Sequence, residues 1–137
     1  MNLKARGMLT AAQFEIMEAS WEAGKHGATV QEIWRRISER RAVGRTTVLN
    51  QVDRLEKRGW LRRVKGDGSL AYAAAIARDE AIARLTGRFV ADFFDGSASH
   101  LVQSLLGSEK LDDRELGHLQ DLLAEETRKR GRKDRMP

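Results

Sequence analysis

Three residues with short polar side chains lie close together near the middle of the chain: Thr46, Thr47 and Asn50. In a helix, Thr46, Asn50 and Arg54 would recur at four-residue spacing on one face. Hydroxyl and carboxamide groups can hydrogen-bond to base edges, and a guanidinium can bind phosphate. A merely solvated helix face more often carries Glu, Lys and Gln, because short polar side chains are poor helix formers. The pattern therefore favours a surface that reads DNA.

A helix-turn-helix is predicted to position this face. The helix that carries the polar residues is expected to begin after Gly44 and to end before Gly59, since glycine is common at both positions. Its apolar side is predicted at Val48, Val52 and Leu55. Two earlier helices are predicted from capping-box signatures, in which a Thr is followed three residues later by Gln or Glu. These signatures are Thr10 with Gln13, and Thr29 with Glu32.

A β-hairpin is predicted directly after the polar helix. Its turn is supplied by the glycine-rich residues 66–68, and its first strand carries the cations Arg62, Arg63 and Lys65. A solvated edge strand protected by charge is the alternative interpretation. Three cations beside a basic helix favour phosphate contact over that alternative. The order helix, turn, helix, hairpin is that of a winged helix, which suits the DNA major groove.

Charge divides the 137-residue chain into three parts. Residues 1–76 carry 14 Lys/Arg and 8 Asp/Glu, or +6, residues 77–126 carry −6, and residues 127–137 carry +5. A basic first half indicates an anionic partner for that half, although charge alone would also allow RNA, a membrane surface or an acidic protein. The absence of cysteine excludes disulfides and thiolate metal sites. With no signal peptide and no membrane-spanning run visible, we expect a cytoplasmic protein without membrane insertion.

The sequence after Ala77 predicts amphipathic helices that cannot form much of a core alone. We therefore expect a mainly α protein with a small β-hairpin: a winged-helix domain over residues 1–76 and a three-helix dimerisation module over 77–126. Residues 127–137 have no apolar stripe, and a basic, disordered tail is predicted there. The alternative for the helices is packing against the first domain in a monomer. The predicted dimerisation residues are Ile82, Leu85, Phe89, Phe93, Leu101, Leu105, Leu116, Leu119, Leu122 and Leu123.

The ordered set of motifs resembles the penicillinase-repressor family of bacterial winged-helix proteins (the BlaI/MecI/CopY type). The resemblance runs from about Leu9 to Glu126, and no single motif in it is diagnostic. It rests on Leu9-Thr10, Glu15, Met17-Glu18, Trp21, Thr29-Val30, Glu32-Ile33, Thr46-Thr47-Val48, Asp53-Arg54-Leu55, Lys57-Arg58-Gly59-Trp60-Leu61, Arg63 and Tyr72.

The resemblance implies a homodimeric repressor that binds a palindromic operator in double-stranded DNA. Base-reading residues of the family map onto Thr46, Thr47 and Asn50, with Arg45 and Gln51 at the margins. Contacts with phosphates are expected from Thr29, Arg54, Arg62, Arg63 and Lys65. In antibiotic-responsive members a sensor protease system relieves repression by cleavage in the dimerisation region. The equivalent stretch here is Ser104-Leu105, where the family commonly has Asn-Phe.

Other functions have less support in the sequence. Asp95, Ser97 and His100 lie close in sequence, but no nucleophile elbow accompanies them, so we do not expect an enzyme. His26, His100 and His118 lack metal-ligand spacing, and no metal or other cofactor is predicted. A winged-helix module that binds only proteins remains the main alternative. RNA binding is less favoured, because the few aromatic residues fall on apolar stripes.

Overall fold

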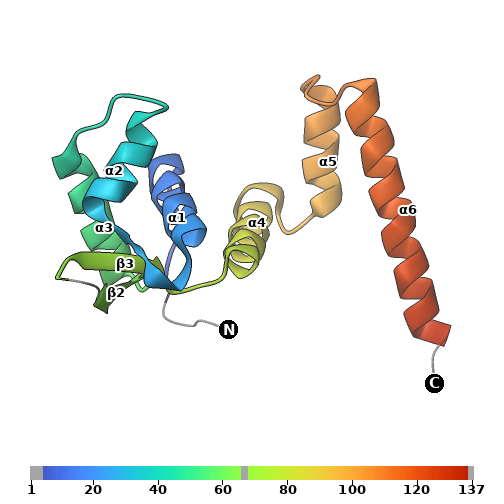
Figure 1. Cartoon of the computed structure of the whole chain (residues 1–137). Helices are drawn as coiled ribbons and strands as arrows, with labels where there is room; N and C mark the ends of the chain where they lie inside the picture. The colour runs from blue at the N-terminus through green and yellow to red at the C-terminus, as the bar shows by residue number, and fades with distance from the viewer. Residues whose placement is uncertain (1–4, 66–67, 136–137) are drawn as a thin grey trace. The chain divides into compact units, whose positions relative to one another are not determined.

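The computed structural model describes residues 5–65 and 68–135. The chain forms two compact units, one ending at Arg88 and the other beginning at Phe89 (Figure 1). The division falls inside helix α4 (Arg78–Phe94), later than the boundary expected after Ile76. The first turns of α4 belong to the first unit, because Ala81 is fully buried there and Leu85 packs against the same core.

The first helix of the first unit, α1 (Ala11–Ala23), begins at the predicted capping box. The Thr10 hydroxyl accepts from the Gln13 backbone N–H, and the Gln13 side chain accepts from the Thr10 N–H. The helix ends at Gly24, and the short 3₁₀ helix η1 (Gly24–His26) follows. A capping box of this kind satisfies two backbone N–H donors that the start of a helix leaves without a partner.

The predicted helix-turn-helix is formed by α2 (Val30–Ser38) and α3 (Arg45–Lys57). Thr29 and Glu32 form the second capping box at the start of α2. Gly44 is the N-cap of α3. After α3, Gly59 adopts a left-handed conformation with φ 82°, and the Gly59 and Trp60 N–H groups donate back to Glu56 and Leu55. This arrangement is a Schellman motif, which favours glycine at that position.

The sheet contains one strand more than the sequence predicted. Strands β2 (Leu61–Lys65) and β3 (Leu70–Ala74) form the hairpin, and β1 (Ala28–Thr29) pairs antiparallel with β3, giving the order β1-β3-β2. Two residues are too few for alternation to reveal a strand. Gly27 makes the pairing possible, because a Cβ there would lie 2.7 Å from the Tyr72 carbonyl oxygen. Of the predicted hairpin turn, Gly66 and Asp67 lie outside the described residues.

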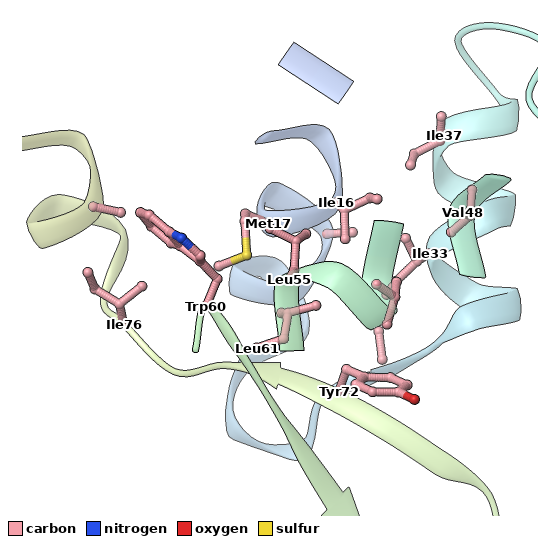
Figure 2. Close-up of a cluster of buried hydrophobic side chains, with 14 of the residues drawn as sticks. Ile16, Met17, Ile33, Ile37, Val48, Leu55, Trp60, Leu61, Tyr72 and Ile76 are labelled. Carbon is pink, nitrogen blue, oxygen red and sulfur yellow. The ribbon is translucent and has the colours of Figure 1, made fainter. Parts of the chain in front are cut away.

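A single apolar core joins the helices to the sheet in the first unit. Figure 2 shows side chains from α1, α2, α3 and the hairpin converging on this core. The largest side chains with less than 2 % exposure include Trp60, Ile16, Met17, Ile33 and Leu55. Burial of side chains of this size contributes roughly 1.5–3 kcal/mol each to folding. The core therefore fixes the position of α3 without help from the second unit.

The second unit contains the end of α4, helix α5 (Ala98–Gly107) and helix α6 (Asp113–Arg135). No described residue from 82 to 135 is buried, and α5 and α6 scarcely contact each other. A disordered tail was predicted from Thr127, but α6 continues as a helix as far as Arg135. Met136 and Pro137 lie outside the described residues. Arg and Lys are good helix formers and are favoured near a helix C-terminus, which accounts for the difference. With this change, the predicted mainly α fold with a small sheet is confirmed.

Candidate nucleic-acid interface

The outward face of α3 carries the predicted reading residues. Val48, Val52 and Leu55 are at most 1 % exposed, so they hold the helix against the core. Thr46, Thr47, Asn50 and Arg54 are all exposed. Because one side of a single rigid helix is buried, the opposite side is presented as a fixed surface. The structure therefore brings these four residues together on the free side of α3.

An exposed leucine in the same helix was missed by the sequence reasoning. Leu49 is 48 % exposed although it lies between the buried Val48 and the exposed Asn50. Its neighbours in the helix register include Thr46 and Asp53, which also face away from the core. A hydrophobic side chain in an otherwise polar surface can contact the methyl group of thymine. The signal that could have revealed it is a leucine outside the apolar spacing of the helix.

The first residue of α3 is held by an aromatic side chain of α2. The Arg45 guanidinium carbon lies 4.5 Å from the centre of the Trp34 ring. The Trp34 indole N–H also donates to the Val43 carbonyl at 2.7 Å, which ties the α2–α3 connection to the same residue. A cation over an aromatic face loses rotamer freedom but keeps its charge. Arg45 is thus a partly preorganised cation at the edge of the α3 surface.

Gln51 has a different position from the other predicted reading residues. It is half-buried, and its Oε1 accepts from the Gln13 Nε2 at 3.0 Å. The Arg58 guanidinium in turn donates to the Gln13 Oε1 at 3.3 Å and to the Arg6 carbonyl. Gln51 therefore faces α1, and its amide links α3 to the start of that helix. This geometry favours a role for Gln51 in positioning α3.

The hairpin separates its three cations. Adjacent residues of a strand point to opposite faces, so Arg63 and Lys65 share one face of β2 and Arg62 points to the other. Arg62 lines a small hollow with Trp21 and Lys25 near the end of α1. Arg63 donates from Nε to the Glu56 carboxylate of α3 at 2.6 Å. The hydrogen bond and charge of Glu56 raise the pKa of Arg63.

The start of α2 is fixed by its capping box. Thr29 is half-buried, pairs with Ala71 in the sheet, and caps α2 through its hydroxyl. The two hydrogen bonds that the Glu32 carboxylate receives from the backbone and the side chain of Thr29 lower the pKa of Glu32. Helix N-termini attract phosphate through free N–H groups and the helix dipole. Glu32 places a negative charge in that first turn, which weakens the attraction for phosphate.

Two groups of cations in the first unit differ in ion pairing. Arg36, Arg41, Arg63 and Arg78 each pair with a glutamate of another element. Arg35, Arg54 and Lys65 make no ion pair with any residue that the structure describes, and Arg54 on α3 and Lys65 on β2 are both exposed. Exposed pairs are weak, so phosphates can compete for the paired cations as well. The cations of the second group can bind phosphate without first breaking an ion pair.

The predicted dimerisation residues differ in exposure. Leu85 packs against the first unit's core, which leaves less of it for a partner. Ile82, Leu101, Leu105 and Leu119 are half-buried. Phe93 and Leu123 are 71 % and 67 % exposed. The others with substantial exposure are Phe89, Leu116 and Leu122, together with Val102 and Leu106, which the prediction did not include.

Other kinds of site have little support in the described part of the chain. No group of three or more His, Cys, Asp or Glu residues in residues 5–65 and 68–135 could hold a metal ion. The same described residues contain no helix that is long and apolar enough to span a membrane.

Comparison with known proteins finds one similarity in sequence and another in fold. The penicillinase repressor of Staphylococcus aureus is 24 % identical over 121 residues, which cover 88 % of this chain and 94 % of that protein. A mutant of MarR from E. coli superposes with a TM-score of 0.51 at 22 % identity, over 85 % of this chain and 76 % of MarR. This second likeness concerns the fold alone.

A structure of BlaI from Bacillus licheniformis, in its monomeric form with the blaP half-operator, is a more distant match. It has a TM-score of 0.46 and 20 % identity, and the match covers 54 % of this chain and 88 % of BlaI. The sequence model of the family described as penicillinase repressor matches residues 9–125. Because this match spans most of the chain, the protein belongs to the penicillinase repressor family, a family of repressors and not of enzymes.

Proposed function

We propose that the protein is a homodimeric transcriptional repressor that reads a palindromic operator with α3 of each protomer. The observation that carries the proposal is the exposed face of α3, held on a packed core and bearing Thr46, Thr47 and Asn50. Membership of the penicillinase repressor family supports the same function. The S. aureus relative is itself named a repressor, and the BlaI structure contains a half-operator.

The reading chemistry follows from the side chains of α3. The Asn50 carboxamide has the donor and acceptor needed for a bidentate contact with adenine, and the threonines can contact several bases. Arg45 suits guanine, and Leu49 suits a thymine methyl group. Gln51 takes the positioning role described above, through Gln13.

Phosphate contacts would fix the register of α3 in the groove. Arg54 and Lys65 are exposed and have no ion pair with the described residues, so they are the first candidates. Arg63 can reach phosphate only if Glu56 releases it or shares it. Arg62 lies on the other face of the hairpin, and Thr29 already caps α2, so we assign both a smaller part. These contacts position the protein but carry no sequence information.

A second copy of this chain is the partner that the second unit suits. The exposed leucines and phenylalanines of α4–α6 have no core of their own to enter, and burying them between two copies would remove them from water. Two-fold symmetry then sets half-sites about 34–36 Å apart, or a multiple of that distance. The dimer places two reading helices on one face of DNA. Binding over a promoter would block transcription.

We also propose that cleavage between Ser104 and Leu105 relieves repression, and that this cleavage requires a local change in α5. Both residues lie inside α5, and their carbonyls accept hydrogen bonds from the N–H and the hydroxyl of Ser108. A protease needs an extended substrate, so α5 must unfold locally before cleavage. Because α5 has no buried residue in the single chain, such opening is inexpensive once the contacts with the second copy are broken. A sensor protease would therefore act on an opened dimerisation module.

Selection of DNA fragments by the purified protein tests the proposal. We expect a palindromic motif, with affinity that falls as salt rises. Asn50→Ala should cost about 1–3 kcal/mol at one base position of each half-site and relax the preference there. Gln31→Ala, at an exposed position of α2, is the control. Salt-sensitive binding without a motif would reject specific reading, and no binding would support the alternative of a protein-interaction module.

A further inference from the structure

Helix α6 changes character along its length. Residues 113–127 carry five acidic residues and one basic residue, for −4, and include all four leucines of the helix. Residues 128–135 carry six basic residues and one acidic residue, for a net charge of +5, and their only other residue is Gly131. All eight residues of this second part are helical and exposed. We call residues 128–135 the basic end of α6.

The basic end lies outside the part of the chain that the family match covers. That match stops at residue 125, and α6 continues to Arg135. Dimerisation accounts for the leucine-bearing part of α6, but it gives no reason for six cations on the turns that follow. The basic end therefore calls for a separate explanation.

Within the basic end, the cations differ in their pairing. Arg128 pairs with Glu125 at 3.0 Å and Arg130 pairs with Glu126 at 3.1 Å, and all four side chains are more than half exposed. Arg132, Lys133 and Arg135 make no ion pair with any residue in the described ranges. Arg128, Arg132 and Arg135 recur at helical spacing, and a shallow hollow between them is lined also by Gly131. Three guanidinium groups thus share one side of the helix.

We propose that the basic end of α6 binds the phosphate backbone of duplex DNA, independently of base sequence. The inference rests on the proposed function only in taking DNA as the partner. Clustered guanidinium groups match phosphate oxygens in charge and geometry. Such contacts release counterions, so they strengthen binding to any DNA and make it more salt-dependent. The basic end adds affinity, and α3 supplies the sequence preference.

Two other polyanionic partners fit the basic end less well. An interfacial membrane helix needs an apolar face, and residues 128–135 offer none. Recognition of single-stranded RNA usually uses aromatic platforms, and α6 contains no Phe, Tyr or Trp. Cations also stabilise a helix C-terminus through its dipole, which is a structural reason for them with no ligand at all. Salt dependence of DNA binding separates that structural reason from the proposal.

The test is the salt dependence of binding to a random-sequence duplex, measured with the full chain carrying Arg132→Gln, Lys133→Gln and Arg135→Gln together. The slope of log K against log salt should become less steep by about 3 per protomer if each cation neutralises one phosphate. The variant with Arg132→Lys and Arg135→Lys should keep the wild-type slope. A control with equal loss of charge in the second unit is Lys110→Gln with Arg114→Gln, compared with Arg132→Gln and Arg135→Gln, and this control should keep the wild-type slope. Glutamine is a good helix former, and circular dichroism checks that helicity is unchanged.

Two results would overturn the inference. One is an unchanged slope in the triple variant, which would leave the cations as helix-stabilising charges. The other is a loss of binding to vesicles containing phosphatidylserine while DNA binding is unaffected, which would assign the basic end to a membrane surface. Because the duplex has random sequence, the result does not depend on an operator. Failure of specific reading by α3 would appear separately, as equal affinity for selected and random DNA.

Discussion

The two units of this protein differ in what holds them together. The first buries residues of α1–α3, the hairpin and the start of α4 in one core, whereas none of the described residues from 82 to 135 is buried. A unit with its own core presents a surface that is fixed before any partner arrives. A unit of exposed amphipathic helices gains most of its stability from what it contacts. The first unit is therefore suited to reading a rigid ligand, and the second to association.

The largest expected effect concerns leucines in the two units. Leu55 is 0 % exposed in the first unit and Leu123 is 67 % exposed in the second. Leu55→Ala should lower the free energy of unfolding by about 2–5 kcal/mol, because it leaves a cavity. Leu123→Ala should change it by less than about 0.5 kcal/mol at protein concentrations low enough to keep the chain monomeric. Urea unfolding measures both, and equal losses would contradict the contrast between the units.

Association of the second unit gives the next effect. Phe93 is 71 % exposed, and Phe93→Asp would place a charge where the proposed dimer buries an aromatic ring. The dissociation constant of the dimer should rise at least tenfold, or about 1.4 kcal/mol. Sedimentation equilibrium provides the measurement. The control Ser99→Asp adds the same charge at an exposed position of α5 and should leave the dimer intact. If the wild-type protein is a monomer at all concentrations, the proposed dimer is wrong.

A smaller effect is expected at the hairpin, where the first unit restrains one of its own cations. Glu56→Gln removes the charge that holds Arg63, so affinity for DNA of any sequence should rise a few-fold. Arg63→Ala should weaken binding to all sequences alike and make the salt dependence less steep. Fluorescence anisotropy at several salt concentrations measures both variants. If Arg63→Ala leaves the slope unchanged, Arg63 makes no contact with phosphate.

The smallest effect is the pH dependence of the α2 start. Hydrogen bonds from Thr29 lower the folded-state pKa of Glu32 below its usual 4.5. The ionised carboxylate therefore stabilises the fold above about pH 4.5, and this contribution is lost as pH falls through the lowered folded pKa. Thermal unfolding of Glu32→Gln, which keeps an acceptor but does not titrate, should lack this part of the acid destabilisation. Identical pH profiles for the two proteins would show that ionisation of Glu32 adds no measurable stability.

Local signals predicted the elements of the first unit well. The capping boxes at Thr10 and Thr29 and the glycine after α3 act over a few residues, so their effects can be read from neighbouring sequence. Strand β1 was missed because its two residues are defined by pairing with β3, which is distant in the chain. Helix at Arg128–Arg135 was missed because absence of an apolar stripe was taken as disorder, although charged helix formers need no stripe to extend a helix.

The candidate interface was predicted in its composition but not in its arrangement. Spacing along α3 was enough to place Thr46 and Asn50 on one face. It could not show that Arg63 is paired with Glu56, that Arg45 lies over Trp34, or that Gln51 faces Gln13. Each of these contacts joins residues from different faces or elements. Such contacts depend on how helices and strands pack, which spacing along one helix does not encode.

Neighbouring residues and ordered motifs were enough to predict the helices of the first unit, their caps, the order of the winged helix and the likeness to a repressor family. The packing of the chain was needed to show which cations are available to a ligand and where the first unit ends along α4. Ion pairs and burial arise when segments far apart in the chain meet. A charge that is counted in the sequence can therefore be held in an ion pair, as Arg63 is, or have no ion-pair partner among the described residues, as Arg54 does.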